Sequence, residues 1–160
     1  MSTSNYPGTV GSAGLHPIER LYRQMIDAWN RRDAAGLSLT FSPDADVIGF
    51  DGSVMHGRDE IRETLDHIFR DHATPPYVVK VRSIRMVSVH TGILFAVVGM
   101  VPPGGSDLDP ALNAMQVVVA AHRDGRLVIE SLQNTPAQFH GHPELAAALT
   151  SELRQVRSDG

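Results

Sequence analysis

The 160-residue sequence predicts an α+β domain: a cone-shaped, strongly curved and mostly antiparallel sheet with helices over its concave face. Apolar residues recur at helical spacing in the first half, and four strand-like runs follow between residues 77 and 136. Within the first run the alternation changes phase, as at the β-bulges that bend sheets. We expect a flexible N-terminal arm over 1–16, the sheet domain over 17–140, and a C-terminal helix and tail over 141–160.

The first helix is predicted to begin at Pro17, where a missing backbone N–H costs least. Its apolar stripe consists of Ile18, Leu21, Tyr22, Met25, Ile26 and Trp29. Asp33 is expected to cap a short second helix, which Ser42-Pro43-Asp44 should end. That second helix would carry Leu37, Leu39 and Phe41.

A short strand with Val47, Ile48 and Phe50 should follow, closed by a hairpin turn at Asp51-Gly52. Residues 59–71 then predict a third helix, which Pro75-Pro76 keeps from continuing. Its apolar face holds Ile61, Leu65, Ile68 and Phe69.

The four later strands are expected over 77–89, 93–101, 114–122 and 127–136. A bulge near Arg82-Ser83 accounts for the change of phase in the first. The two middle strands are apolar on both faces, so we expect helices on one face and a second copy of the chain on the other, giving a homodimer.

The last helix is predicted over residues 143–157, with Leu145, Leu149, Leu153 and Val156 on one side. Two placements remain open for it. It either closes the mouth of a pocket or exchanges with the same helix of a partner subunit.

The composition excludes several classes of protein. The net charge is −4 with mixed signs, which argues against nucleic-acid partners. Without cysteine there is no disulfide, thiolate catalysis or cysteine-ligated zinc. No apolar run has the length of a membrane span and no secretory signal is present, so we expect a cytoplasmic protein with no membrane partner.

The order of elements resembles the nuclear transport factor-like superfamily, which includes ketosteroid isomerase and the SnoaL-type polyketide cyclases. Within it the sequence is similar to the SgcJ/EcaC-type family across about residues 17–140. The matching segments are Trp29-Asn30, residues 33–37, residues 44–46, Asp51-Gly52, Gly57-Arg58, Ile61 and residues 133–135. The resemblance implies the fold and a role in natural-product biosynthesis, notably of enediyne polyketides.

Ketosteroid isomerases use an aspartate base with a tyrosine and a protonated carboxylic acid that bind the oxyanion. Alignment on Asp33 and Asp44-Ala45 places the tyrosine at Met25, the base at Gly49 and the acid near Val119. None of these residues transfers protons, so we reject this mechanism for the chain.

The last strand offers the best remaining polar candidates, because Glu130, Leu132 and Asn134 share a face that we expect to point into the pocket. Glu130 is the candidate general base, and Asn134 could orient a carbonyl or hydroxyl group. The simpler alternatives are an ion pair of Glu130 with an arginine such as Arg126 and a backbone contact of Asn134. The other expected ligand-binding residues are Tyr22, Met25, Trp29, Leu65, Phe69 and Val119. For Tyr22 and Trp29 the simpler alternative is core packing, because the spacing of the stripe already predicts burial.

Eight histidines suggest a metal, but their spacing brings no three or four ligands together, so we expect no metal and no cofactor. The first hypothesis is a pocket protein that binds an apolar, polyketide-like intermediate and assists cyclisation, isomerisation or dehydration. The second is a non-catalytic carrier that shields a reactive intermediate. The third is a subunit-interaction module, which a cavity filled by its own side chains would indicate.

Overall fold

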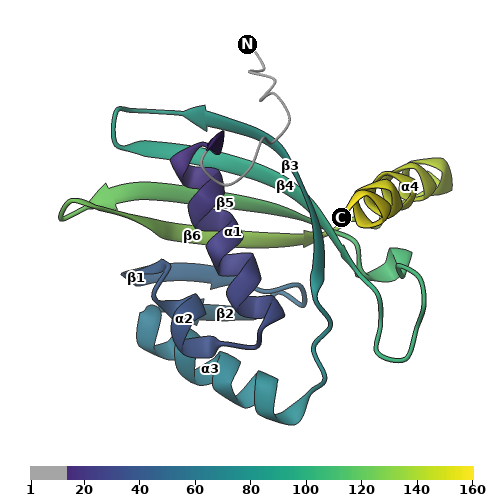
Figure 1. The fold of residues 1–160 in the computed structure, drawn as a ribbon, viewed down its shortest axis with the longest axis horizontal. Coiled ribbons are helices and arrows are strands. Elements are labelled where there is room, and N and C mark those ends of the chain that lie inside the picture. Colours follow the sequence, from purple (N-terminus) through teal and green to yellow (C-terminus); the bar gives the residue numbers. More distant parts are fainter. Residues whose placement is uncertain (1–13) are drawn as a thin grey trace.

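The computed structural model describes residues 14–160, so the arm expected over 1–16 lies almost entirely outside the described residues. The first half forms α1 (Pro17–Asn30), α2 (Ala34–Ser38), β1 (Phe41–Ile48), β2 (Val54–His56) and α3 (Arg58–Asp71). The second half forms β3 (Tyr77–Met86), β4 (Thr91–Met100), the 3-10 helix η2 (Pro110–Leu112), β5 (Ala114–Arg123), β6 (Arg126–Pro136) and α4 (Pro143–Asp159). The α+β class with a curved sheet is confirmed (Figure 1).

One six-stranded sheet has the order β2-β1-β6-β5-β4-β3, and only β1 and β6 run parallel among its pairs. Helices α1, α2 and α3 lie on one side of it (Figure 1). The main core lies between these helices and the sheet, with Tyr22, Phe41 and Ile129 at most 1% exposed. This arrangement confirms helices over the concave face.

The residues that were expected to begin α1 and to cap α2 do so in the structure. Pro17 is the first residue of α1, and the His16 imidazole accepts a hydrogen bond from the backbone N–H of Ile18. The Asp33 carboxylate caps α2 by accepting from the backbone N–H of Gly36 at 2.9 Å.

The end of α2 was predicted wrongly. The helix ends at Ser38, and residues 41–44 belong to β1 rather than to a helix end. Pro43 fits there because the β1–β6 register shifts between Phe41 and Asp46. At such an irregularity a proline removes no regular ladder hydrogen bond.

Two further register shifts shape the sheet. The β3–β4 register shifts between Val81 and Ser83, which confirms the bulge predicted near Arg82-Ser83. A second shift lies between β5 and β6, where Val119 faces Ser131 but Ala120 faces Ile129. Glu130 is therefore an extra residue in β6, and the strand changes its alternation there.

Helix α4 packs on the opposite side of the sheet from α1–α3. Leu149 and Leu153 form a second apolar cluster with Val97 of β4, Leu108 and Ala137. The ion pairs Arg82–Glu152 and Arg154–Asp107 hold the helix there. No α4 residue lines the main cavity, so the expectation that it closes the pocket mouth is wrong.

Candidate functional site

A cavity of about 290 Å³ lies between the concave side of the sheet and helices α1 and α3. Most of its lining is apolar, from Met25, Ile26 and Trp29 of α1 to Ile61, Leu65 and Ile68 of α3. The other lining residues are Leu37, Phe41, Val47, Gly49, Phe50, Asp51, Ser53, Met55, Thr64, Tyr77, Gln116, Leu132 and Asn134. Its volume is at the lower end of small-molecule sites.

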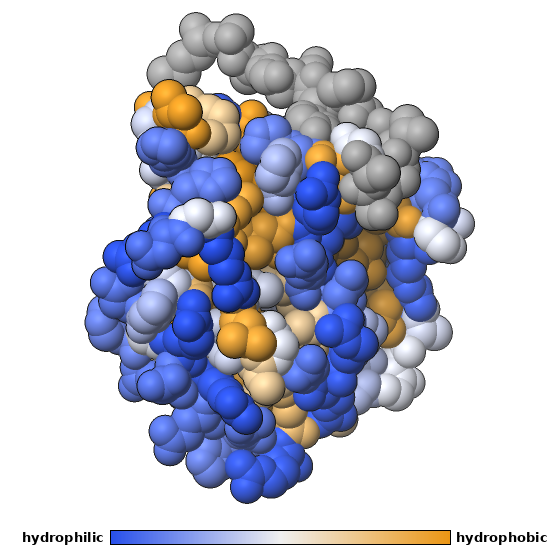
Figure 2. Space-filling view, turned by 60° about the vertical axis from the view of Figure 1, so that its left-hand side comes forward, coloured by the Kyte–Doolittle hydropathy of each residue, from blue (hydrophilic) through white to orange (hydrophobic). Residues whose placement is uncertain are grey.

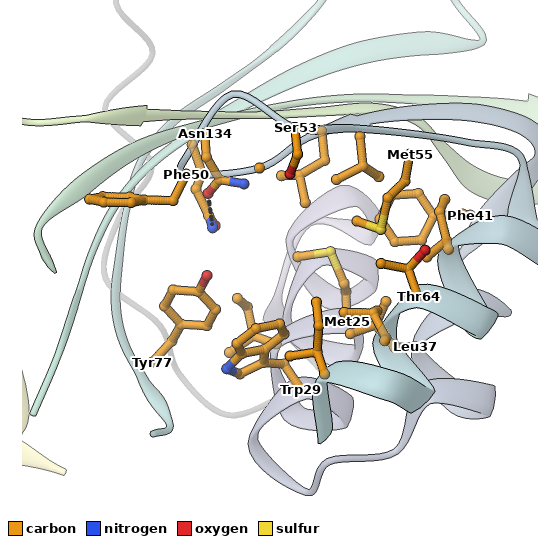
Figure 3. A pocket seen from close by; sticks show the side chains of 18 of the residues that line it. Met25, Trp29, Leu37, Phe41, Phe50, Ser53, Met55, Thr64, Tyr77 and Asn134 are labelled. Atoms are coloured by element: carbon orange, nitrogen blue, oxygen red, sulfur yellow. Dashed lines mark hydrogen bonds between the residues drawn. The ribbon is translucent and has the colours of Figure 1, made fainter. Parts of the chain in front are cut away.

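A chain of three hydrogen bonds crosses one side of the cavity. The Tyr22 hydroxyl donates to the Gln116 side-chain oxygen, and Gln116 Nε2 donates to Asn134 Oδ1 at 2.7 Å (dashed line in Figure 3). Asn134 Nδ2 then donates to the backbone oxygen of Ile48 at 3.0 Å. The sheet register sets up the central bond, because Gln116 of β5 lies directly opposite Asn134 of β6.

Tyr77 stands at the same side of the cavity, with its hydroxyl directed into the open space (Figure 3). Its backbone N–H donates to the Asn30 side chain at 2.9 Å, and its ring packs against Trp29 at 5.2 Å between centroids. Burial raises the pKa of Tyr77 to about 12. The phenol is therefore a neutral hydrogen-bonding group at physiological pH.

Among the lining residues in the described part of the chain, Asp51 is the one carboxylate, and it lies exposed at the rim in the turn that joins β1 and β2. Its Oδ1 accepts from the hydroxyl and the backbone N–H of Ser53. These hydrogen bonds hold the pKa of Asp51 below its usual range. A carboxylate stabilised in its ionised form is a weak general base.

Five of the nine predicted site residues line the cavity: Met25, Trp29, Leu65, Leu132 and Asn134. The Trp29 indole N–H donates to the backbone oxygen of Pro75 at 3.1 Å, so its polar tip is already occupied. For Asn134 the two expectations hold together: its side chain donates to the backbone oxygen of Ile48, and it also lines the cavity.

The other four residues lie elsewhere. Tyr22 is fully buried in the core and reaches the cavity only through Gln116, and burial raises the pKa of its hydroxyl. Phe69 packs behind Trp29 in an edge-to-face contact at 5.2 Å. Val119 pairs with Ile93 and Ser131 on the opposite face, because Gln116, Val118 and Ala120 are the residues of β5 that face inward.

Glu130 is the main correction. Its carboxylate pairs with Arg123 Nε at 2.8 Å and accepts from the Ser42 hydroxyl at 3.0 Å, outside the cavity lining. The partner is Arg123 rather than Arg126, whose guanidinium donates to the backbone oxygen of Leu39. The bulge in β6 turns Glu130 out of the alternation that takes Leu132 and Asn134 inward, so its predicted place in the pocket is wrong.

Sequence reasoning missed Gln116, Tyr77 and Phe50. Gln116 is the one polar residue in the apolar run 114–121, a signal that could have marked it. Within residues 14–160, no three histidine, aspartate or glutamate side chains gather as metal ligands. Across the same residues, no helix is long and apolar enough to cross a membrane.

Comparison with known proteins gives a family and a fold. The model of the SnoaL-like domain family matches residues 22–130, more than half of the chain. None of the curated proteins matches.

Among solved structures, a domain of unknown function with a cystatin-like fold from Nostoc punctiforme is 27% identical, with a TM-score of 0.74 over 94% of this chain and 95% of that chain. A ketosteroid isomerase-like protein from Erwinia carotovora atroseptica is 14% identical, with a TM-score of 0.63 over 76% of this chain and 94% of that chain. An NTF-2-like protein of unknown function from Shewanella oneidensis MR-1 is 18% identical, with a TM-score of 0.58 over 74% and 95%. The chain therefore belongs to the SnoaL-like domain family and has the nuclear transport factor-like fold.

Proposed function

We propose that the protein binds a small, largely apolar molecule in the cavity, as a pocket protein of natural-product metabolism. The observation that carries this proposal is the open cavity of about 290 Å³ with its mainly apolar lining. Burial of an apolar ligand against such walls is favourable by about 25 cal/mol per Å² of apolar surface. Membership of the SnoaL-like family and the resemblance to the SgcJ/EcaC-type proteins support a polyketide-like ligand.

Two forms of this function differ in what happens to the ligand. In the first, the protein assists a cyclisation, isomerisation or dehydration; in the second, it carries and shields an intermediate. The carrier form is favoured because Glu130 lies outside the cavity and Asp51 is held ionised at its rim. Met25 and Gly49, which the sequence alignment places at the isomerase tyrosine and base positions, line the cavity without a group that transfers protons. An open cavity also argues against a pure interaction module.

Native mass spectrometry separates the two forms. The purified protein is incubated with a hydrophobic metabolite extract from the source organism, and the retained small molecule is identified before and after prolonged incubation. A ligand recovered unchanged supports the carrier, and a ligand of altered mass or altered isomeric form supports catalysis. A spectrum without any retained molecule would contradict the proposed function.

We also propose a homodimer through the face of the sheet opposite the cavity, with the protein in the cytoplasm. Beside the area that α4 covers, Phe95 lies opposite Val117 and Ile93 opposite Val119, all half-buried or exposed. Figure 2 views the molecule from another side and shows further apolar side chains at the surface, in the upper and central part of the picture. Light scattering of the wild type should give twice the chain mass and Val117→Lys the monomer mass. A monomeric wild type would contradict this proposal.

A further inference from the structure

We propose that the ligand carries an uncharged hydrogen-bond acceptor, a ketone or lactone carbonyl, which docks against the side-chain amides of Gln116 and Asn134 and the hydroxyl of Tyr77. This inference names the ligand class of the cavity and rests on the proposed function.

The two ends of the hydrogen-bond chain fix how both amides are turned. The backbone oxygen of Ile48 can only accept, so Asn134 must present its NH2 group there and its oxygen toward Gln116. Gln116 must then donate to Asn134, which leaves its oxygen for the Tyr22 hydroxyl. Each amide nitrogen carries two hydrogens and uses one in the chain. One N–H of each amide is therefore unused by the chain of hydrogen bonds. Asn134 is half-buried at the cavity wall, and Gln116 meets the cavity with only 1% of its surface exposed.

Tyr77 adds a third hydrogen-bonding group beside these amides. Its hydroxyl makes no hydrogen bond with any other described residue, although its ring packs against Trp29 and its backbone N–H donates to Asn30. In Figure 3 the hydroxyl points into the cavity toward the side where Asn134 lies. A neutral phenol donates readily to a carbonyl oxygen.

The charges of the lining select among acceptors. Among residues 14–160, no lysine, arginine or histidine lines the cavity, and the one charged side chain there is the carboxylate of Asp51. A carboxylate ligand would lose its water without gaining a cation, and Asp51 would repel it. A neutral carbonyl has neither cost, and it meets hydrogen-bond donors in an apolar setting where each bond is strong.

Calorimetry with three probes of nearly equal size and shape tests the inference: naphthyl methyl ketone, ethylnaphthalene and naphthoate. We expect the ketone to bind roughly tenfold more tightly than the hydrocarbon, as one or two net hydrogen bonds give, and naphthoate to bind most weakly. Equal binding of ketone and hydrocarbon, or a preference for naphthoate, would overturn the carbonyl inference and leave the apolar pocket standing. If neither ketone nor hydrocarbon binds, the proposed function and this inference both fail.

Two variants test whether the Tyr77 hydroxyl causes the preference for the ketone over the hydrocarbon. Tyr77→Phe leaves no protein group unpaired, so it should fold normally and reduce the ketone-to-hydrocarbon affinity ratio by roughly threefold to tenfold. Thr135→Val is the control, because it removes an exposed hydroxyl of β6 outside the cavity lining and should leave that ratio unchanged. The carbonyl stretching frequency of the bound ketone gives a second readout, since hydrogen bonding lowers it. A ratio and a frequency that Tyr77→Phe leaves at wild-type values would overturn the role of Tyr77.

Discussion

The side-chain amides of Gln116 and Asn134 meet at 2.7 Å across the β5–β6 pair, where they join the buried Tyr22 hydroxyl to the wall of the cavity. This contact links the core to the proposed ligand site. It also explains why a glutamine that is only 1% exposed is stable in an apolar strand, since both ends of its amide are hydrogen-bonded.

Loss of the hydroxyl should affect stability at Tyr22 but not at Tyr77. Tyr22→Phe leaves the buried Gln116 oxygen without its donor, so the free energy of unfolding should fall by about 1–3 kcal/mol. Tyr77→Phe breaks no protein hydrogen bond and should change it by less than about 0.5 kcal/mol. Urea unfolding followed by circular dichroism measures both. Equal losses in the two variants would contradict the hydrogen-bond chain.

Arg32 is expected to stabilise the end of α3. Its guanidinium donates to the backbone oxygens of Phe69 and His72, while its own backbone has φ 60°. Arg32→Ala should lower the free energy of unfolding by about 1–2 kcal/mol through the lost hydrogen bonds. Arg32→Gly loses the same bonds but recovers about 1 kcal/mol, because glycine adopts positive φ without strain.

Chemical denaturation of the two Arg32 variants side by side checks this order. A glycine variant no more stable than the alanine variant would mean that the backbone strain is absent. Wild-type stability in both would mean that the guanidinium contacts contribute nothing.

His56 should titrate above its ordinary pKa of 6.5, because its hydrogen bond with Asp46 and the charge of that carboxylate favour the imidazolium. A raised pKa in the folded state stabilises the fold fully below pH 6.5, and this contribution is lost as the pH rises through the folded value. Asp46→Asn should return the pKa of His56 toward 6.5. NMR titration of the imidazole in both proteins measures it, and an unchanged pKa in the variant would exclude Asp46 as the cause.

Glu130→Gln should leave ligand binding intact. The carboxylate contacts Arg123 and Ser42 outside the cavity, and the glutamine oxygen can still accept from the Ser42 hydroxyl. We expect wild-type affinity for naphthyl methyl ketone and a loss of stability from the half-buried ion pair with Arg123. A folded variant that no longer binds the ketone would place Glu130 back in the site.

The helices and strands are predicted well from the sequence where a regular apolar spacing or a local hydrogen bond determines them. The stripe from Ile18 to Trp29, the Asp33 cap and the bulge beside Ser83 all follow from spacing or from a local hydrogen bond. Pro43 misled the prediction of β1, because a proline normally ends an element and here lies at an irregularity in the sheet.

The lining of the site was harder to predict. Side chains of a strand alternate between the two faces of the sheet, so an error of one residue reverses which side chains point into the cavity. Strand β5 is apolar on both faces, so its pattern does not say whether Gln116 or Val119 points inward. In β6 the bulge at Glu130 reverses the alternation within one strand, and a pairing irregularity of this kind leaves no mark in the sequence of the strand itself. Tyr77 was recognised as the start of a strand, but its position over the cavity depends on contacts with Asn30 and Trp29 of α1.

The most direct test of the whole account is a crystal structure of the protein with naphthyl methyl ketone. We predict the naphthalene ring between Met25, Leu65 and Leu132, with the carbonyl oxygen within hydrogen-bonding distance of Tyr77 and the Gln116 and Asn134 amides. A ketone bound elsewhere on the molecule, with this cavity closed by its own side chains, would contradict the central claim that the cavity is the ligand site.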